Sequence, residues 1–254
     1  MCFIGIDLGS VATKGVLIKD NNFYWTLVPT GWNPKEAGEK VVSELLNQLD
    51  ISIDQVKAIV GTGYGRISLP LLSKKVTEIA CHAKGNHFLF PELDLVIDIG
   101  GQDSKIIKLS KEGKVQDFIM NDKCAAGTGR FLQGVCGVLN CSLDELGTWA
   151  LEVSNPIHIN SMCAVFAESE IIGLLAQGVE KEQIAAGVLE SICIRVASMA
   201  QRVGAYKKVA FSGGLALLPG FSMRLSNHLK AQVDQGPNPQ IVGALGAALL
   251  AADY

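Results

Sequence analysis

Two stretches of the chain follow one template, and this repetition limits the folds open to it. Asp7 to Lys14 and Asp98 to Lys105 each follow an apolar run, begin Asp-x-Gly and carry Lys at the eighth place. A buried strand that ends in such a turn exposes backbone N–H groups that can bind phosphate oxygens, while the Asp attracts a hydrated divalent cation. One copy is also ordinary turn chemistry. Two copies predict two halves that bind a polyphosphate, and therefore a protein that binds and hydrolyses a nucleotide.

Length and composition set the outer limits. The chain has 254 residues, of which 48% are hydrophobic, enough for one large or two medium domains. A net charge of −3 gives no indication of a nucleic-acid partner. The longest apolar run, 241–252, is shorter than the roughly 20 residues of a membrane span, so we expect no membrane association. We expect no secretory signal, and we expect the seven cysteines to be reduced thiols in the cytoplasm.

Hydrophobic periodicity predicts an α/β fold in which the same strand–turn–strand pattern occurs twice. The first pass contains three strands in a meander, a helix, a further strand and a second helix, at Phe3–Asp7, Lys14–Lys19, Phe23–Val28, Pro34–Leu49, Val56–Gly61 and Lys75–Phe90. After Pro91 the strand–turn–strand pattern restarts at Leu93. A hairpin, four helices, one strand and two more helices follow, at Lys105–Leu109 with Val115–Met120, then Ala125–Leu139, Ser142–Ala150, Ala164–Gln177, Ile184–Tyr206, Val209–Phe211, Pro219–Ala231 and Val242–Ala252.

A third glycine turn, Ser212-Gly213-Gly214, again lies between an apolar strand and a helix. Its glycines would let a flat base or ribose lie against the backbone. The last helix contains Gly243-Ala244-Leu245-Gly246, whose small side chains suit either a hinge crossing or simple tight packing. Both interpretations of that helix stay open.

The ordered set of two phosphate turns, a Ser-Gly-Gly turn and a small-residue helix resembles the actin, sugar-kinase and heat-shock chaperone ATPase superfold. The resemblance implies two similar domains hinged around a nucleotide cleft, residues 1–92 with 240–254 and residues 93–239. It also implies that Asp7 and Asp98 hold Mg²⁺ through water. The residues that bind ATP or ADP would be Gly9, Ser10, Val11, Ala12, Thr13, Lys14, Gly100, Gly101, Gln102, Gly213 and Gly214.

For two types of side chain in the turns, glutamine and lysine, the sequence predicts more specific roles. Gln102 is a candidate to orient the attacking water, because an amide both donates and accepts hydrogen bonds. Lys14 and Lys105 either contact phosphate or are solvated strand residues, and for Lys105 we expect the solvated state.

A second internal template, Asn-x-x-Cys-Ala, occurs at Asn121 to Ala125 and at Asn160 to Ala164, each before a predicted helix. An Asn near the N-cap would place Cys124 and Cys163 in the first helical turn, where free N–H groups favour a thiolate. Metal centres built only of sulfur ligands normally need four. A symmetric dimer would supply four thiolates, whereas inert core cysteines are the alternative.

The string NDKCAAGTGRF at 121–131, together with CAVFAESE at 163–170, Thr62 to Arg66 and Asp98 to Asp103, resembles the activator ATPases of 2-hydroxyacyl-CoA dehydratases. The same family includes ATPase subunits of benzoyl-CoA reductase and reductases of double-cubane cluster proteins. The resemblance spans the whole chain. It implies a homodimer with one 4Fe–4S cluster held by Cys124 and Cys163, and adenine near Gln240. Val11 departs from a position that is often small and hydroxylated, which puts that one contact in doubt.

These observations predict an ATP-dependent one-electron reductase. Ferredoxin or flavodoxin would be the donor, and a dehydratase or reductase containing a metal cluster would be the acceptor. A small-molecule kinase of the same superfold and a nucleotide-switched scaffold with structural zinc are the alternatives. The other cysteines, Cys2, Cys81, Cys136, Cys141 and Cys193, are expected to be core or boundary residues, and His82 a surface residue beside Cys81.

Overall fold

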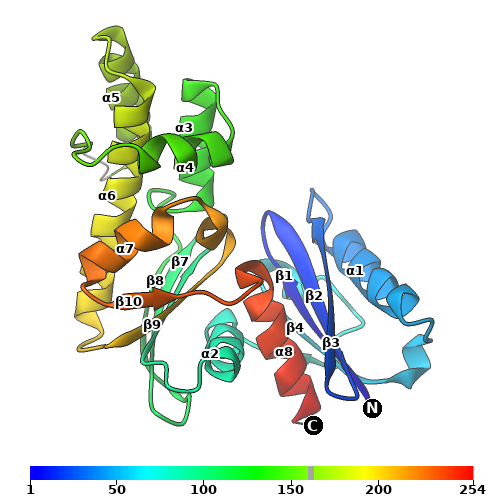
Figure 1. The fold of residues 1–254 in the computed structure, drawn as a ribbon. Helices are drawn as coiled ribbons and strands as arrows, with labels where there is room; N and C mark the ends of the chain where they lie inside the picture. Colours follow the sequence, from blue (N-terminus) through cyan, green and yellow to red (C-terminus); the bar gives the residue numbers. More distant parts are fainter. Residues whose placement is uncertain (160–162, 254) are drawn as a thin grey trace. The chain divides into compact units, whose positions relative to one another are not determined.

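The computed structural model describes residues 1–159 and 163–253 and contains two five-stranded sheets (Figure 1). Their strand orders are β3-β2-β1-β4-β5 and β10-β9-β6-β7-β8. If the five strands of each sheet are numbered in chain order and the second sheet is read from its β8 edge, the two orders are the same. The predicted α/β fold and its restart are therefore confirmed. By contacts the chain divides into a first unit, Met1–Val96, Leu109–Gln116 and Gly236–Tyr254, and a second unit, Ile97–Lys108 and Asp117–Gln235.

The first sheet begins with the predicted meander. Its strands are β1 (Cys2–Leu8), β2 (Ala12–Lys19), β3 (Asn22–Pro29), β4 (Val56–Thr62) and β5 (Lys74–Lys75). β2 is antiparallel to both β1 and β3, whereas β4 is parallel to β1 and β5 is parallel to β4. Asp20 and Asn21 both have positive φ, as a two-residue turn of this twist requires, and so set the β2–β3 hairpin.

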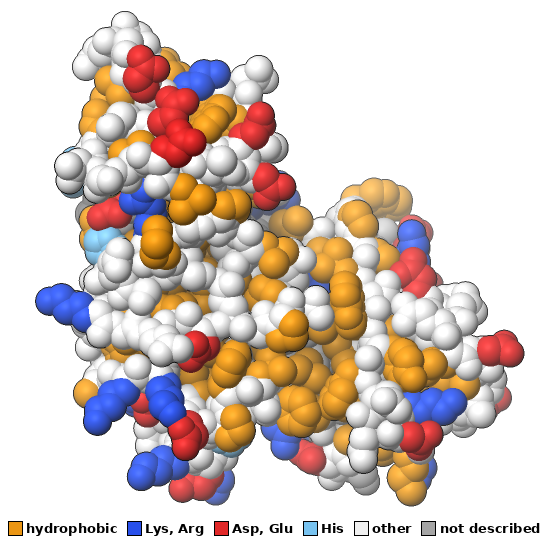
Figure 2. Space-filling view, in the orientation of Figure 1, with side chains coloured by type: hydrophobic (Ala, Val, Ile, Leu, Met, Phe, Trp, Pro, Cys, Tyr) orange, Lys and Arg blue, Asp and Glu red, His pale blue; other side chains and the backbone are white. Residues whose placement is uncertain are grey.

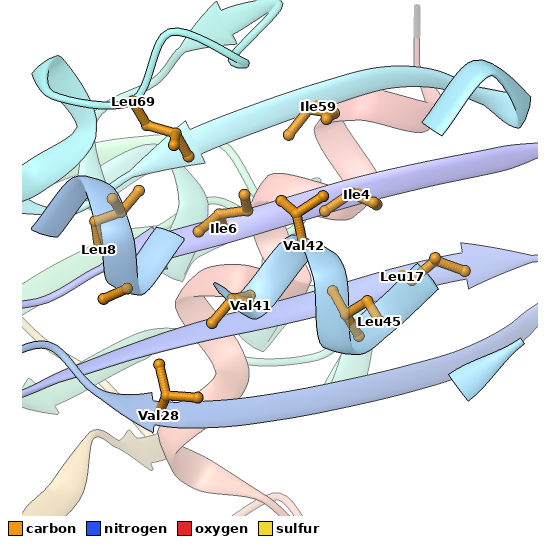
Figure 3. Close-up of a cluster of buried hydrophobic side chains, with 11 residues drawn as sticks. Ile4, Ile6, Leu8, Leu17, Val28, Val41, Val42, Leu45, Ile59 and Leu69 are labelled. Carbon is orange, nitrogen blue, oxygen red and sulfur yellow. The ribbon is translucent and has the colours of Figure 1, made fainter. Parts of the chain in front are cut away.

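Two layers of helix cover this sheet. Ile4, Ile6 and Leu8 project from β1 toward α1 (Pro34–Gln48), where Val41 and Leu45 complete a buried apolar cluster (Figure 3). The opposite face, through Val16, packs on α8 (Val242–Ala252). Full burial of each large apolar side chain stabilises the fold by about 1.5–3 kcal/mol. Alternating side chains along the strands, such as Leu17 and Val16 of β2, therefore pack on α1 at one face of the sheet and on α8 at the other.

The small residues of α8 permit very close packing. A Cβ at Gly5 of β1 would lie 2.0 Å from the Ala248 backbone nitrogen. A Cβ at Gly246 would lie 1.8 Å from the Cys81 carbonyl oxygen of α2 (Glu78–Leu89). The tight-packing interpretation of this helix is confirmed, because no side chain larger than hydrogen fits at either contact.

The second sheet comprises β6 (Leu95–Ile99), β7 (Ser104–Leu109), β8 (Val115–Asn121), β9 (Lys208–Ser212) and β10 (Gln232–Asp234). Between β8 and β9 the chain forms α3 (Gly129–Leu139), α4 (Leu143–Leu151), α5 (Ala164–Ala176) and α6 (Lys181–Arg202). α7 (Phe221–Leu229) separates β9 from β10. The predicted helix from Ala125 is wrong in its first four residues. Gly127 has φ +88° and Thr128 is an extended N-cap, so α3 begins only at Gly129.

α6 is the one helix among the described residues that is long and apolar enough to cross a membrane, and 67% of its most apolar window is buried inside the protein. That burial is the pattern of a core helix. On the face drawn in Figure 2, Lys and Arg side chains are interspersed with Asp and Glu, with hydrophobic groups between them.

Candidate functional site

The first phosphate turn lies where β1 ends. Asp7 is 5% exposed and is paired in register with Lys14 on β2 and with Thr62 on β4. The Lys14 ammonium lies 3.1 Å from Asp7 Oδ2. A Cβ at Gly9 would come within 3.0 Å of the same ammonium. Lys14 is therefore folded over the turn instead of extending into solvent, and its charge lies beside the predicted phosphate-binding backbone.

A threonine from the end of the meander holds this turn in shape. Thr30 Oγ1 donates to the Gly9 carbonyl at 2.7 Å, and Thr30 N donates to the Val11 carbonyl at 3.0 Å. The buried hydroxyl of Thr13 lies 2.9 Å from that of Thr30. Thr13 thus stabilises the turn from its buried side. Within the turn, Val11 is 41% exposed and Ser10 is half-buried.

The second phosphate turn has the same plan but a closed interior. Lys105 Nζ lies 3.3 Å from Asp98 Oδ2 and 2.7 Å from Asp103 Oδ2. These three side chains are 2%, 3% and 5% exposed. The expectation that Lys105 is solvated is therefore wrong. Two carboxylates compensate the cost of removing its ammonium from water, and the alternation of β7 points it inward.

Each Asp is also covered by a glycine turn at the end of a further strand in its sheet. Gly213 has φ +93°, and a Cβ there would lie 2.3 Å from the Ile99 carbonyl and 2.9 Å from Asp98 Oδ1. Gly63 has φ +87°, and its Cβ would lie 2.4 Å from the Leu8 carbonyl and 2.7 Å from Asp7 Oδ1. Only glycine fits both the left-handed backbone and the close approach.

A residue with a hydroxyl group precedes each of these two glycines, so the surroundings of Asp7 and Asp98 correspond in this respect too. Ser212 Oγ donates to Asp98 Oδ1 at 3.1 Å, and Thr62 is the register partner of Asp7. The sequence signal is a hydroxyl residue followed by glycine after an apolar strand. It identifies Ser212-Gly213, but sequence reasoning missed the equivalent Thr62-Gly63 as the matching part of the first site.

The second turn is joined directly to α3. Gly100 N donates to the Asp103 carbonyl at 2.9 Å and closes the turn. The Gly100 and Gly101 carbonyls accept from Gly129 N and Arg130 N at 3.0 and 2.8 Å. The first residues of α3 are thus hydrogen-bonded to the predicted phosphate turn.

Three of the predicted ligands have clear positions, but no contact among the described residues assigns them a role. Gln102 is exposed in the β6–β7 turn, and Gly214 begins a short 3-10 helix, Gly214–Leu217. Gln240 is half-buried in the 3-10 turn Pro239–Ile241 before α8. The roles predicted for them in water orientation and base binding stay predictions.

Cys124 lies in the loop between β8 and α3, five residues before the helix, so the expectation of a first-turn position is wrong. Asn121 does not cap the helix. Its side-chain Nδ2 instead donates to the carbonyls of Cys124 and Ala126 at 3.0 and 3.2 Å. The asparagine therefore shapes the cysteine loop itself.

Cys163 is the N-cap residue of α5, one position before the predicted first turn, and Asn160 of its motif lies outside the described residues. Cys124, Cys141 and Cys163 are half-buried, and all seven cysteines, each among the described residues, are thiols outside disulfides. The others are buried, as predicted, and burial raises the pKa of both Cys81 and Cys136 to about 12. His82 is 5% exposed, so its predicted surface position is wrong. The approach of Gly243, whose Cβ would lie 2.9 Å from His82 Nε2, covers its ring.

Within residues 1–159 and 163–253, no group of three or more His, Cys, Asp or Glu side chains could hold a metal ion. A metal centre that includes Cys124 and Cys163 would therefore need further ligands besides the described His, Cys, Asp and Glu side chains of this one chain.

Two sheets of one strand order, each with an Asp-x-Gly turn backed by a hydroxyl-Gly turn, give the chain an actin/sugar-kinase-like fold. The chain belongs to the BadF/BadG/BcrA/BcrD ATPase family, whose model matches residues 4–251. Membership of this family supports nucleotide binding and ATP hydrolysis.

Individual relatives align along nearly their whole length. The 2-hydroxyisocaproyl-CoA dehydratase activator of Clostridioides difficile is 37% identical over 100% of this chain and 96% of its own. A solved structure of such an activator with bound ADPNP has a TM-score of 0.93, with 100% of this chain and 95% of the other covered. A benzoyl-CoA reductase component from Thauera aromatica is 30% identical over 98% of this chain and 92% of its own.

Proposed function

We propose that this protein is an ATP-dependent activator that passes single low-potential electrons to a partner enzyme of the 2-hydroxyacyl-CoA dehydratase, benzoyl-CoA reductase or double-cubane type. Relatives that are activators of such dehydratases, or a component of such a reductase, support the partner class. All seven cysteines are thiols outside disulfides, which suits a protein that works in a reducing cytoplasm. Ferredoxin or flavodoxin would be the donor.

The observation that carries the proposal is the link between the second phosphate turn and the cysteine loop. Gly100 and Gly101 accept hydrogen bonds from the first residues of α3, and Cys124 lies just before that helix. Thr128 Oγ1 donates to the Ala125 carbonyl at 2.7 Å and ties the loop to the start of the helix. A movement of the turn when the terminal phosphate is bound or lost would shift the cysteine loop through a few bonded residues.

In the nucleotide site, the turn amides and Lys14 would bind the phosphates, while Asp7 and Asp98 would hold Mg²⁺ through water. Gln102, exposed at the second turn, would orient the attacking water. Each Asp is supported by a lysine and a glycine turn, so its carboxylate is held in place before the nucleotide arrives. Such preorganisation lowers the cost of binding and of stabilising the transition state.

The cysteines fit a bridging 4Fe–4S cluster, which would supply one-electron storage. Cys124 and Cys163 are half-buried and belong to the same unit, and two thiols per chain become four in a homodimer. Val165 and Phe166, two and three residues after Cys163, are 69% and 73% exposed. Apolar side chains this exposed mark a surface that another protein covers, and a second copy of the chain would do so beside the cluster ligand.

Iron content and oligomeric state test the cluster assignment. The protein prepared without oxygen should be a dimer that contains iron and absorbs visible light. Cys124→Ser and Cys163→Ser should lose both signals, while Cys141→Ser, a change at the third half-buried cysteine, should keep them. A monomer that contains no iron would contradict the proposal, and colourless zinc-loaded protein would indicate the scaffold alternative.

The coupling to ATP is tested by access to the iron. In the presence of an iron chelator, the rate of iron loss should differ between the ATP-bound and ADP-bound protein. Thr128→Val, which removes the side-chain hydrogen bond to the Ala125 carbonyl and keeps the one from the Thr128 backbone N–H, should reduce that difference. Equal rates in both nucleotide states, or transfer of the terminal phosphoryl group to a sugar or carboxylate, would contradict the proposed activator.

A further inference from the structure

A cavity of about 730 Å³ opens beside Cys124 in the second unit. Its walls come from the end of β8, from the Cys124 loop, from one face of α6 and from His158 and Ile159. The α6 residues that line it recur at three- and four-residue spacing, from Ser191 to Arg202. The helix therefore presents one continuous stripe to the cavity.

The charged side chains that line this cavity are two arginines. Arg195 and Arg202 lie two turns apart on the α6 stripe, and His158 adds an imidazole to the lining. Among the described residues no Asp or Glu lines the cavity, although the whole chain has a net charge of −3. A cationic concavity on a net acidic protein is an attractive site for a negatively charged group.

The two arginines differ in how they are held. A Cβ at Gly127 would lie 3.0 Å from Arg195 Cδ, so the aliphatic stem of Arg195 packs under the cysteine loop. Arg202 is exposed near the end of α6. One arginine thus fixes positive charge against the Cys124 loop, and the other extends it toward solvent.

The apolar lining favours a protein as the occupant over a small anion. Met120 and Ile194 are 40% and 49% exposed on the cavity wall. Exposed Met and Ile beside Arg are characteristic of protein–protein interfaces, where an apolar centre lies next to charged groups. A free phosphate or carboxylate would use the arginines and leave these side chains in water.

We infer that this cavity is the docking site for the acidic surface of the electron-donor protein. The inference rests on the proposed function, because it takes Cys124 to be the point where electrons enter. Carboxylates of the donor would contact Arg195 and Arg202, and apolar groups at its centre would cover Met120 and Ile194. A donor held there lies directly against the cysteine loop, with its charge complementary to the cavity.

Binding of a purified acidic ferredoxin to the complete iron-loaded protein tests the inference. The Arg202→Gln variant and the Arg195→Gln/Arg202→Gln double variant should bind ferredoxin on the order of tenfold more weakly at low ionic strength, with the larger loss in the double variant. The wild-type affinity should fall as salt is added, and the variants should respond less, because exposed charge pairs are screened beyond about 10 Å at 0.1 M salt. Lys111→Gln, an equal charge change at an exposed turn outside the cavity, is the matched control.

Reduction by the cationic methyl viologen radical separates this inference from the proposed function. This small reductant has no acidic surface to dock, and its own positive charge is repelled by the arginines, so it should reduce the variants at least as fast as the wild type. An iron-free wild type would overturn the proposed function and the inference together. Normal iron and viologen reduction with unchanged ferredoxin affinity in both arginine variants would overturn the docking site alone. So would an equal loss in Lys111→Gln, or weakened binding of the acceptor enzyme but not of ferredoxin.

Discussion

The two phosphate turns share a sequence template and differ in how deeply their lysines are buried. Lys14 contacts one carboxylate, and the two side chains are 17% and 7% exposed. Lys105 contacts two carboxylates, and the trio is 5% exposed or less. A single, partly hydrated ion pair can exchange its carboxylate for an incoming phosphate. A lysine enclosed by two carboxylates cannot do so without leaving charges buried, which indicates a structural role for Lys105 and a ligand-binding role for Lys14.

The largest effect should come from breaking the enclosed trio. Lys105→Met leaves Asp98 and Asp103 buried without their cation, and loss of one partner of a buried ion pair costs about 3–5 kcal/mol. Lys14→Met should cost less than Lys105→Met, because Lys14 contacts a single carboxylate and is itself 17% exposed. Urea unfolding of both variants measures the difference. Equal losses would mean that the two lysines play the same part.

The glycines that cover each Asp should be equivalent, in contrast to the lysines. Gly63→Ala and Gly213→Ala each place a Cβ against backbone at a left-handed φ, so each should lose about 1–3 kcal/mol of unfolding free energy. Gly134→Ala on α3, where a Cβ meets nothing within 4 Å, is the control and should be neutral or stabilising. A large loss of unfolding free energy at only one of the two turns would mean that the Gly63 and Gly213 turns are not structurally equivalent.

Replacing Lys14 should weaken nucleotide binding more than replacing Lys105, which is the reverse of the order expected for unfolding free energy. Lys14→Met removes the cation beside the first turn, and a hydrogen bond to a charged group contributes about 1.5–3 kcal/mol, so Mg²⁺-ATP should bind at least about tenfold more weakly. Calorimetric titration with a non-hydrolysable ATP analogue measures this directly. Lys14→Arg should recover part of the affinity. Unchanged binding in Lys14→Met would remove Lys14 from the phosphate site.

The repeated topology could be predicted because it depends on local signals that occur twice. Apolar strands, Asp-x-Gly turns and the restart after Pro91 are each visible in a few residues, and both sheets have the same strand order. The burial of Lys105 could not be predicted in the same way. Its partners Asp98 and Asp103 are near in sequence, but only the packed sheet determines that all three side chains point inward.

The cysteine loops show a second limit of sequence patterns. The motif predicts Asn121 as a helix cap, yet this side chain donates to the carbonyls of its own loop, because a left-handed Gly127 delays the start of α3. Asparagine side chains stabilise loops as readily as helix starts. The strands β5 and β10, with two and three residues, are too short to show alternation. The candidate ligands could thus be named from sequence, whereas the support around them required the packed fold.

The smallest expected effect concerns thiol reactivity, which also distinguishes the two units. Both cysteines of the first unit, Cys2 and Cys81, are buried, whereas the second unit carries the half-buried Cys124, Cys141 and Cys163. In iron-free folded protein at pH 8, iodoacetamide should label Cys124 and Cys163 first, ahead of Cys141, because burial raises the pKa of the Cys141 thiol. Cys81 should be labelled only at the rate of global unfolding, because burial raises its pKa to about 12 and keeps it protonated and covered.

Mass spectrometry of timed samples gives the labelling order, and urea-unfolded protein, in which all seven thiols react, is the control. Equal labelling of Cys81 and Cys163 in the folded protein would mean that the first unit also exposes a thiol. Labelling confined to the second unit, with stability unchanged, would instead place every thiol available for redox chemistry in that unit. The first unit would then supply only nucleotide contacts, so that the two repeats of one fold have diverged in chemistry as well as in the burial of their lysines.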